Sequence, residues 1–250
     1  MSAIACFSFD NLGEAADIGA GRLAGPLPPG EEPSIAVGLP KLLALLDRCG
    51  LRGTFFVEGW NGQQHPRAVA EIAARGHELG MHGWLHETWN ALDAATEADR
   101  AARATDALEA AAGVRPQGFR APGGRRSAAT EGILLRLGYR YDASLGDAMT
   151  PMRLPGGLAQ VPFVWAGVDG AYYLRPDPPT PERVRDAWLA ALARSAERGG
   201  LFVLICHAFI TGADDARIAA LEAVMDSARR DDRIAVKTIG EVADAIAWTP

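Results

Sequence analysis

The segment 76–87, "GHELGMHGWLHE", contains three of the five histidines of this 250-residue chain. His82 and His86 stand four residues apart, a spacing that places two imidazoles on one face of a helix or lets a tight loop bring them to one ion. This pattern predicts a site for a divalent metal. Such a site needs a partner carboxylate and a reaction to support, so the rest of the chain must supply both.

Groups that can ligate a metal, transfer a proton or orient a substrate follow most of the short apolar runs in the chain. They are Asp10 and Asn11, Glu58 and Trp60, His82 and His86, Arg120, Asp142, and His207. Because the carboxyl ends of parallel strands meet at one edge of a sheet, we expect these side chains to converge there. The repetition favours an active site, whereas His65 and His77 are predicted to have structural roles.

The apolar runs that precede these residues predict strands, and amphipathic segments between them predict helices. The predicted strands are 4–9, 53–57, 77–81, 118–121, 139–142, 158–163, 201–206 and 233–237. The predicted helices are 34–50, 66–76, 97–113, 128–138, 181–199, 214–230 and 238–248, and Gly50 and Gly113 are among their expected C-terminal stops. Repeated β-then-α units imply a parallel sheet, and about seven or eight of them favour a barrel. We expect one α/β domain over 1–250, with an irregular, aromatic-rich stretch at 143–180.

The composition indicates a soluble globular protein, with 48% hydrophobic and 22% charged residues. A formal charge of −6 and the lack of a basic run predict no nucleic-acid and no membrane partner. No segment approaches the roughly 20 apolar residues of a membrane span, and the N-terminus does not resemble a signal peptide. Three cysteines argue against a disulfide framework. We therefore expect a cytoplasmic protein, and the abundance of Ala, Gly and Arg suggests a bacterial source.

Five ordered motifs resemble those of the polysaccharide deacetylase family, also called the NodB-homology domain or carbohydrate esterase family 4. They are "SFDN" (8–11), "GHELGMHGWLH" (76–86), "FRAPGG" (119–124), "GYRYDASL" (138–145) and "LICH" (204–207). The resemblance implies a distorted (β/α) barrel of seven or eight strands. It also implies one divalent ion, usually zinc with cobalt or nickel as alternatives, and hydrolysis of an N-acyl group.

The resemblance assigns a role to each matching residue. Asp10 would be the general base, Arg120 would hold and tune Asp10, and His82 and His86 would be metal ligands. Asp142 would support that charge network, His207 would be the general acid, and Leu204 would line the acyl pocket. These roles suit amide hydrolysis, which needs a polarised carbonyl, a base for water and an acid for the leaving amine.

Asn11 departs from the family pattern, which usually places a second, metal-binding Asp directly after the base. The amide oxygen of Asn11 can ligate a metal, but it is neutral, so we expect weaker binding if it does. Alternatively, Asp10 itself is the ligand, or the nearby Glu14 and Asp17 compensate. The third protein ligand therefore stays open at this point.

The segments "QVPFVWAGVDGAYY" (160–173) and "HAFITGADDARIAALEAVM" (207–225) resemble an intracellular branch of the family that includes allantoinase-like hydrolases. A closed, aromatic pocket suits a small molecule better than a polymer, and members of this branch often form dimers or tetramers. The residues expected to contact the substrate are Glu58, Trp60, Pro122, Gly123, Trp165, Asp169, Tyr172 and Leu204.

The leading hypothesis is a metal-dependent hydrolase that removes an acetyl or other acyl group from the nitrogen of a small, intracellular, amino-sugar-like substrate. A second hypothesis keeps the fold and changes the reaction to ring-opening of a cyclic ureide or imide. A third is a catalytically inactive binding protein, for which Asn11 is the sole support in the sequence.

Overall fold

The computed structural model describes residues 2–146 and 150–246. These residues form nine strands: β1 (Ala3–Asp10), β2 (Thr54–Val57), β3 (Glu78–Met81), β4 (Gly118–Phe119), β5 (Tyr141–Asp142), β6 (Met152–Arg153), β7 (Ala159–Gln160), β8 (Leu201–His207) and β9 (Ile234–Val236). The α-helices are α1 (Ala15–Gly19), α2 (Leu39–Cys49), α3 (Gly59–Gln64), α4 (Pro66–Ala74), α5 (Ala94–Ala112), α6 (Thr130–Arg136), α7 (Gly170–Tyr173), α8 (Pro181–Arg198), α9 (Asp215–Arg230) and α10 (Ile239–Asp244). Short 3-10 turns and one π turn complete these elements, among them η3 (Pro122–Gly124) and η4 (Trp165–Gly167).

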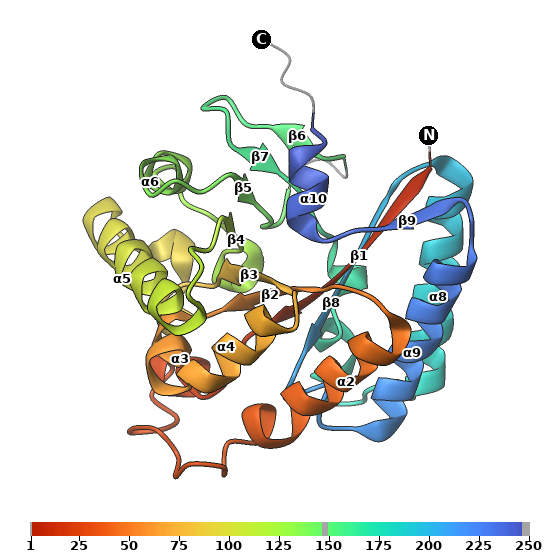
Figure 1. The fold of residues 1–250 in the computed structure, drawn as a ribbon, viewed down its shortest axis with the longest axis horizontal. Helices are drawn as coiled ribbons and strands as arrows, with labels where there is room; N and C mark the ends of the chain where they lie inside the picture. Colours follow the sequence, from red (N-terminus) through yellow and green to blue (C-terminus); the bar gives the residue numbers. More distant parts are fainter. Residues whose placement is uncertain (1, 147–149, 247–250) are drawn as a thin grey trace.

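The strands form one curled sheet in the order β6-β7-β5-β4-β3-β2-β1-β8. Each neighbouring pair is parallel except β6 with β7. The first strand, β1, pairs with β8 along its length, while its other edge pairs with β9 near Ala3 and with β2 near Asp10. Figure 1 shows α2 and α4 on the outside of the sheet and α8 beside α9 on the flank next to β8. This single-domain half-barrel confirms the predicted distorted (β/α) fold.

The predicted elements match the structure most closely where the sequence pattern is longest. Strand β1 is buried at nearly every position, as expected for a parallel strand covered on both faces. Helix α2 buries its leucines and ends at Gly50, and α5 ends at Gly113. Both glycines adopt a positive φ, the conformation that lets a glycine terminate a helix.

The structure adds short elements that the sequence analysis did not predict, namely α1, α3, α7 and the antiparallel strand β6. Each spans six residues or fewer, which is too short for a periodic pattern to be distinguished from a loop. The last helix, α10, ends at Asp244, whereas we predicted an end at 248, and 247–250 lie outside the described residues.

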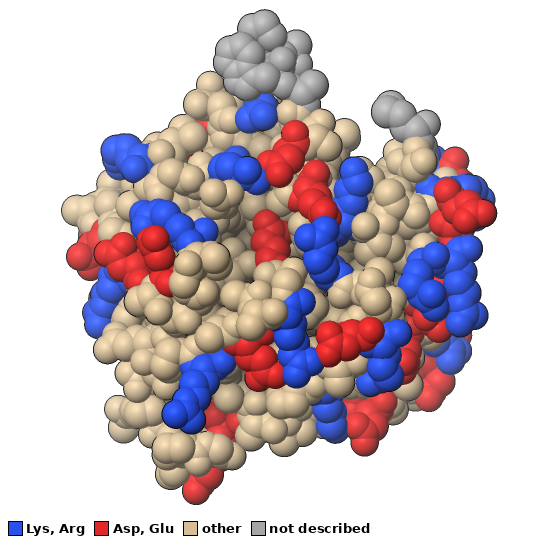
Figure 2. All heavy atoms as spheres, in the orientation of Figure 1, with Lys and Arg blue, Asp and Glu red and all other residues tan. Residues whose placement is uncertain are grey.

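The three cysteines are free and buried. Among the described residues, no helix combines the length and the hydropathy needed to cross a bilayer. Figure 2 shows Lys and Arg side chains interspersed with Asp and Glu on the face turned to the viewer. Neither sign of charge is therefore gathered into one large patch on this face.

Candidate active site

The polar residues that follow the apolar runs lie at the carboxyl edge of the sheet, as predicted. Asp10 ends β1 and His207 ends β8, and the two are direct Cα partners across the parallel pair. The partner of Asp10 on its other side is Phe56 of β2, next to Val57, which pairs with Met81 of β3. The register of these four strands therefore brings the expected base, the expected acid and the two-histidine segment to one place.

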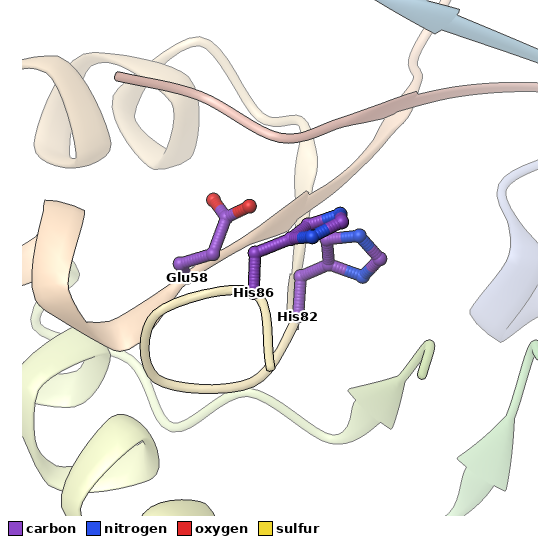
Figure 3. A group of neighbouring side chains, drawn as sticks. All are labelled: Glu58, His82 and His86. Carbon is purple, nitrogen blue, oxygen red and sulfur yellow. The ribbon is translucent and has the colours of Figure 1, made fainter. Parts of the chain in front are cut away.

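Glu58, His82 and His86 form a cluster in which each residue offers a ligand atom, and these atoms lie within 4.8 Å of one another. Because Val57 pairs with Met81, the next residues, Glu58 and His82, leave β2 and β3 side by side. His86 comes from the loop after β3, so the histidine spacing is that of a loop rather than a helix. Its φ of 59° is rare for a residue with a side chain. Figure 3 shows the two imidazoles beside each other with the Glu58 carboxylate next to them.

The chemistry of this cluster fits a divalent metal. The Nδ1 atom of His82 lies 2.8 Å from the Arg120 carbonyl oxygen, which only accepts hydrogen bonds. Nδ1 must therefore carry the proton, and Nε2 is left as the nitrogen that can ligate. Burial lowers the pKa of His82 well below its ordinary value, and the neighbouring His86 lowers it further, which favours the neutral form that metals bind.

Glu58 completes the donor set. Its Oε2 accepts from the Leu12 and Asn61 nitrogens at 3.3 and 3.0 Å, whereas Oε1 is buried and has no hydrogen-bond partner among the described residues. Burial raises the pKa of Glu58 well above its ordinary value, so its ionised form needs a compensating cation. Two imidazole nitrogens and one carboxylate oxygen form a ligand set that suits zinc and leaves a coordination position open.

This arrangement changes two sequence-based expectations. Glu58 was expected to contact the substrate, but it is fully buried and lies in the histidine cluster. Glu14 and Asp17, which were one alternative to compensate for Asn11, are occupied elsewhere. Glu14 pairs with His65 at 2.6 Å, and Asp17 pairs with Arg22 at the surface.

Asp10 forms a buried ion pair with Arg120, as the family resemblance implied. Arg120 Nη1 lies 2.7 Å from Asp10 Oδ1 and 2.8 Å from the Ser8 hydroxyl, and its Nε donates to the Ala143 carbonyl at 2.9 Å. The guanidinium also lies 4.2 Å from the centre of the Phe56 ring. These contacts hold Arg120 rigidly, and Arg120 in turn fixes the orientation of Asp10.

A second carboxylate, Asp169, orients His207. Its Oδ1 lies 2.5 Å from His207 Nδ1, and its Oδ2 accepts from the His207 backbone N–H and the Thr211 hydroxyl at 2.8 and 2.6 Å. Burial alone would lower the pKa of His207, but the charge and hydrogen bond of Asp169 outweigh burial and raise it. Asp169 was predicted to contact the substrate, but it is fully buried and its carboxylate is bonded to His207, where its charge favours the imidazolium.

Asp142 was predicted to support the Asp10–Arg120 pair, but it contacts other residues. Its carboxylate accepts from Arg126 at 2.8 Å and from the Ser144 hydroxyl at 2.6 Å. The Ser144 hydroxyl in turn accepts from the Ala121 backbone N–H at 2.9 Å. Asp142 therefore acts on the loop that follows Arg120, and burial raises its pKa.

A cleft of about 320 Å³ joins these groups. It is lined by Asp10, His82, His86, Arg120, Ala121, Gly123, Gly124, Phe163, Trp165, Val168, Gly170, Ala171, Leu174, Ile205 and His207. Two residues predicted to contact the substrate, Gly123 and Trp165, lie in this lining. Pro122 instead borders a neighbouring hollow that also includes Gly123 and His86.

Three other predicted substrate contacts lie elsewhere. The Trp60 ring packs edge-on against His65, with 6.4 Å between ring centres. Tyr172 donates to the Ala166 carbonyl at 3.0 Å. Leu204 is buried in the core, and the next residue, Ile205, lines the cleft. Ile205 was missed because β8 is buried on both faces, which leaves no alternation to show the side that faces the cleft. Phe163 was missed because it lies after the end of β7, in a segment without a periodic pattern.

A crystal structure from Mycobacterium smegmatis, assigned to the polysaccharide deacetylases, has the same fold, with a TM-score of 0.88 and 32% sequence identity. The alignment covers 98% of this chain and 90% of that one. This chain belongs to the polysaccharide deacetylase family. The family model for polysaccharide deacetylase matches residues 32–141. Members of the family are hydrolases that act on carbon–nitrogen bonds other than peptide bonds.

Other relatives match over shorter regions or at lower identity. A peptidoglycan deacetylase-like protein from Gibberella zeae is 36% identical over 111 residues, which are 44% of this chain and 33% of that protein. A peptidoglycan deacetylase from Helicobacter pylori is 34% identical over 109 residues, 44% of this chain and 37% of that protein. The matched region is thus about a third of these curated relatives. The crystal structure of an allantoinase has a TM-score of 0.83 at 20% identity over 97% and 90% of the two chains, and it shares the fold.

Proposed function

We propose that this protein is a metal-dependent hydrolase that cleaves a linear amide and removes an acetyl or other acyl group from a small molecule. The observation that carries the proposal is the cluster of Glu58, His82 and His86 beside a cleft that also contains the Asp10–Arg120 pair and His207. A metal-binding set, a base and an acid in one cleft are what amide hydrolysis requires. A binding protein has no need of all three.

Glu58, His82 and His86 would hold the ion. When bound, a divalent ion there would polarise the amide carbonyl and lower the pKa of water. Asp10, held by Arg120, would accept the proton of the attacking water. Asn11 remains a predicted additional ligand, with the lower affinity expected of a neutral oxygen.

His207 would deliver a proton to the leaving amine. Asp169 accepts from Nδ1 and leaves Nε2 to carry the transferable proton. Because Asp169 raises the pKa of His207, the imidazolium persists to higher pH than a free histidine would allow. An amine is a poor leaving group unless it is protonated, so this pairing favours acid catalysis.

The test has two parts on one preparation. Metal is removed with a chelator and restored as Zn²⁺, Co²⁺ or Ni²⁺, and the bound ion is counted by elemental mass spectrometry. Each form is then assayed on N-acylated amines and, in parallel, on a cyclic ureide and a cyclic imide. We expect about one ion per chain and metal-dependent hydrolysis of linear amides. Turnover of the cyclic compounds alone would replace the proposed reaction, and no turnover by any metal-loaded form would support the inactive alternative.

The other sequence-based expectations stay predictions. They are a cytoplasmic location, a dimer or tetramer, zinc as the physiological metal, and the lack of nucleic-acid and membrane partners. Cell fractionation and light scattering on the purified protein would test the first two directly.

A further inference from the structure

The polar side chains that line the cleft all belong to the proposed machinery. They are Asp10, His82, His86, Arg120 and His207. Asp10 is paired with Arg120, and His207 is bonded to Asp169. Among the described lining residues, Arg120 Nη2 is the one buried side-chain donor without a hydrogen-bond partner.

Apart from the indole N–H of Trp165, the side chains of the remaining lining residues are apolar or belong to glycine. Phe163, Trp165, Val168 and Leu174 come from the segment between β7 and α8, and Ile205 comes from β8. The Phe163 and Trp165 rings meet edge-to-face with 5.5 Å between centres. Trp165 is 48% exposed and Leu174 is 67% exposed, so apolar surface extends from the cleft to the solvent.

This lining is a poor match for a sugar ring. Each hydroxyl that leaves water needs a hydrogen-bond partner in the site, and an unpaired one costs free energy. Specific small-molecule sites therefore place polar groups where the ligand has them. Apart from the catalytic groups, the cleft has no charged or amide side chain among its described lining residues.

We infer that the substrate amide carries an apolar substituent of several carbons, which lies against Phe163, Trp165, Leu174 and Ile205. This inference rests on the proposed function, and it departs from the amino-sugar-like scaffold that the family resemblance implied. Residues 163–174, which form one wall of the cleft, would then select the substrate, while the strand ends would perform the reaction.

The test compares N-acetylglucosamine with N-acetylcyclohexylamine, whose ring has the same size but no hydroxyls, and with N-butanoyl- and N-hexanoylcyclohexylamine. Affinity is measured by calorimetry on zinc-loaded Asp10→Asn protein, in which the proposed base is neutral, so that turnover does not interfere. Hydrolysis is measured on the wild-type protein. We expect the cyclohexylamides to bind at least tenfold more tightly than the sugar, with a gain of up to about fourfold for each methylene that enters the cleft.

Leu174→Asn in the same background locates the effect. We expect it to reduce the advantage of the hexanoyl over the acetyl compound several-fold, because it makes the exposed end of the wall polar. Leu135→Asn is the matched control, since Leu135 is also an exposed leucine but lies on α6 outside the cleft lining. It should leave that advantage unchanged.

The outcomes separate the inference from the proposed function. Equal or tighter binding of N-acetylglucosamine would overturn the inference, whether or not any amide is hydrolysed. The inference would also be overturned if the hexanoyl compound kept its full advantage over the acetyl compound in both Leu174→Asn and Leu135→Asn. If the apolar amides bind as expected but no compound is hydrolysed by the wild-type protein, the inference stands and the proposed reaction fails.

Discussion

The two sides of the cleft are built differently. On one side, the functional residues lie at the ends of neighbouring strands of the sheet, so the register of the strands fixes their positions. These residues are Asp10, Glu58, His82, Arg120 and His207. On the other side, residues 163–174 form short turns around η4 and α7. They contact β8 through the bridge between Val168 and Ile205 and through Asp169. The proposed chemistry thus lies at the strand ends, and most of the wall that would contact the substrate lies on an irregular segment.

Asp169 is the point at which the two sides depend on each other. It belongs to the irregular segment, but its carboxylate accepts from both the ring and the backbone N–H of His207 at the end of β8. The wall is therefore more than a lid over the reaction, since one of its residues sets the charge of the proposed acid.

The largest effect is expected from the rigid side. His82→Ala removes a ligand, so bound metal should be lost and kcat/KM should fall on the order of 10³-fold, as the loss of several kcal/mol of transition-state stabilisation implies. Elemental analysis and steady-state kinetics measure the two quantities. His77→Ala is the control, because His77 is buried but accepts from the Gly53 N–H away from the cluster. If His82→Ala retains its metal, His82 is not a metal ligand.

The next effect tests the connection between the sides. Asp169→Asn removes the charge that raises the pKa of His207, so the protonated form should be lost at lower pH. The alkaline limb of kcat/KM should move to lower pH, and the rate at neutral pH should fall on the order of 10²-fold. Thr211→Val removes a hydrogen bond to Asp169 but keeps the charge, so its limb should stay in place. An unmoved limb in Asp169→Asn would show that His207 is not the group that titrates.

A smaller effect concerns how tightly the wall packs on the strand-end side. Gly123 and Gly124 have φ values of 69° and 77°, so alanine at either position should cost about 1–2 kcal/mol of unfolding free energy. A Cβ on Gly124 would also lie 2.9 Å from Phe163 Cζ, whereas one on Gly123 meets no atom within 4 Å. Urea unfolding should therefore show Gly124→Ala to be less stable than Gly123→Ala by about 1–3 kcal/mol. Equal losses would mean that Phe163 moves aside freely.

The smallest effect is expected at Tyr172, which was predicted from sequence to contact the substrate. Its hydroxyl donates to the Ala166 carbonyl, and the residue lies outside the cleft lining. Tyr172→Phe should change the unfolding free energy by about 0.5–1.5 kcal/mol at most and leave kcat/KM within about twofold. A clear rise in KM with unchanged stability would restore Tyr172 to the substrate site.

The strand-end residues could be predicted because an apolar run in a parallel sheet also marks where the strand ends. That rule and the order of the strands were enough to predict the positions of Asp10, His82 and His207. The role of Glu58 could not be assigned in the same way. Its proximity to His82 depends on the register of Val57 with Met81, and the sequence does not specify that register.

The wall was the part that sequence reasoning described least well. Strand β8 is apolar from Leu201 to Cys206, so nothing in the sequence distinguishes Leu204, which faces the core, from Ile205, which faces the cleft. A shift of one residue exchanges the faces. Asp169 sits in a segment without periodicity, and its contact with His207 spans 38 residues of sequence. Long-range contacts from irregular segments leave no local pattern.

The most direct test of the account is the affinity of the protein for Zn²⁺ and Co²⁺ in wild type and in Glu58→Gln, measured by calorimetry and by the absorption spectrum of bound Co²⁺. Glu14→Gln is the matched control, because Glu14 is another buried glutamate beside a histidine, outside the cluster. We predict one ion per chain in the wild type, an affinity at least about tenfold lower with an altered Co²⁺ spectrum in Glu58→Gln, and no change in Glu14→Gln. Wild-type affinity and spectrum in a folded Glu58→Gln protein would contradict the account.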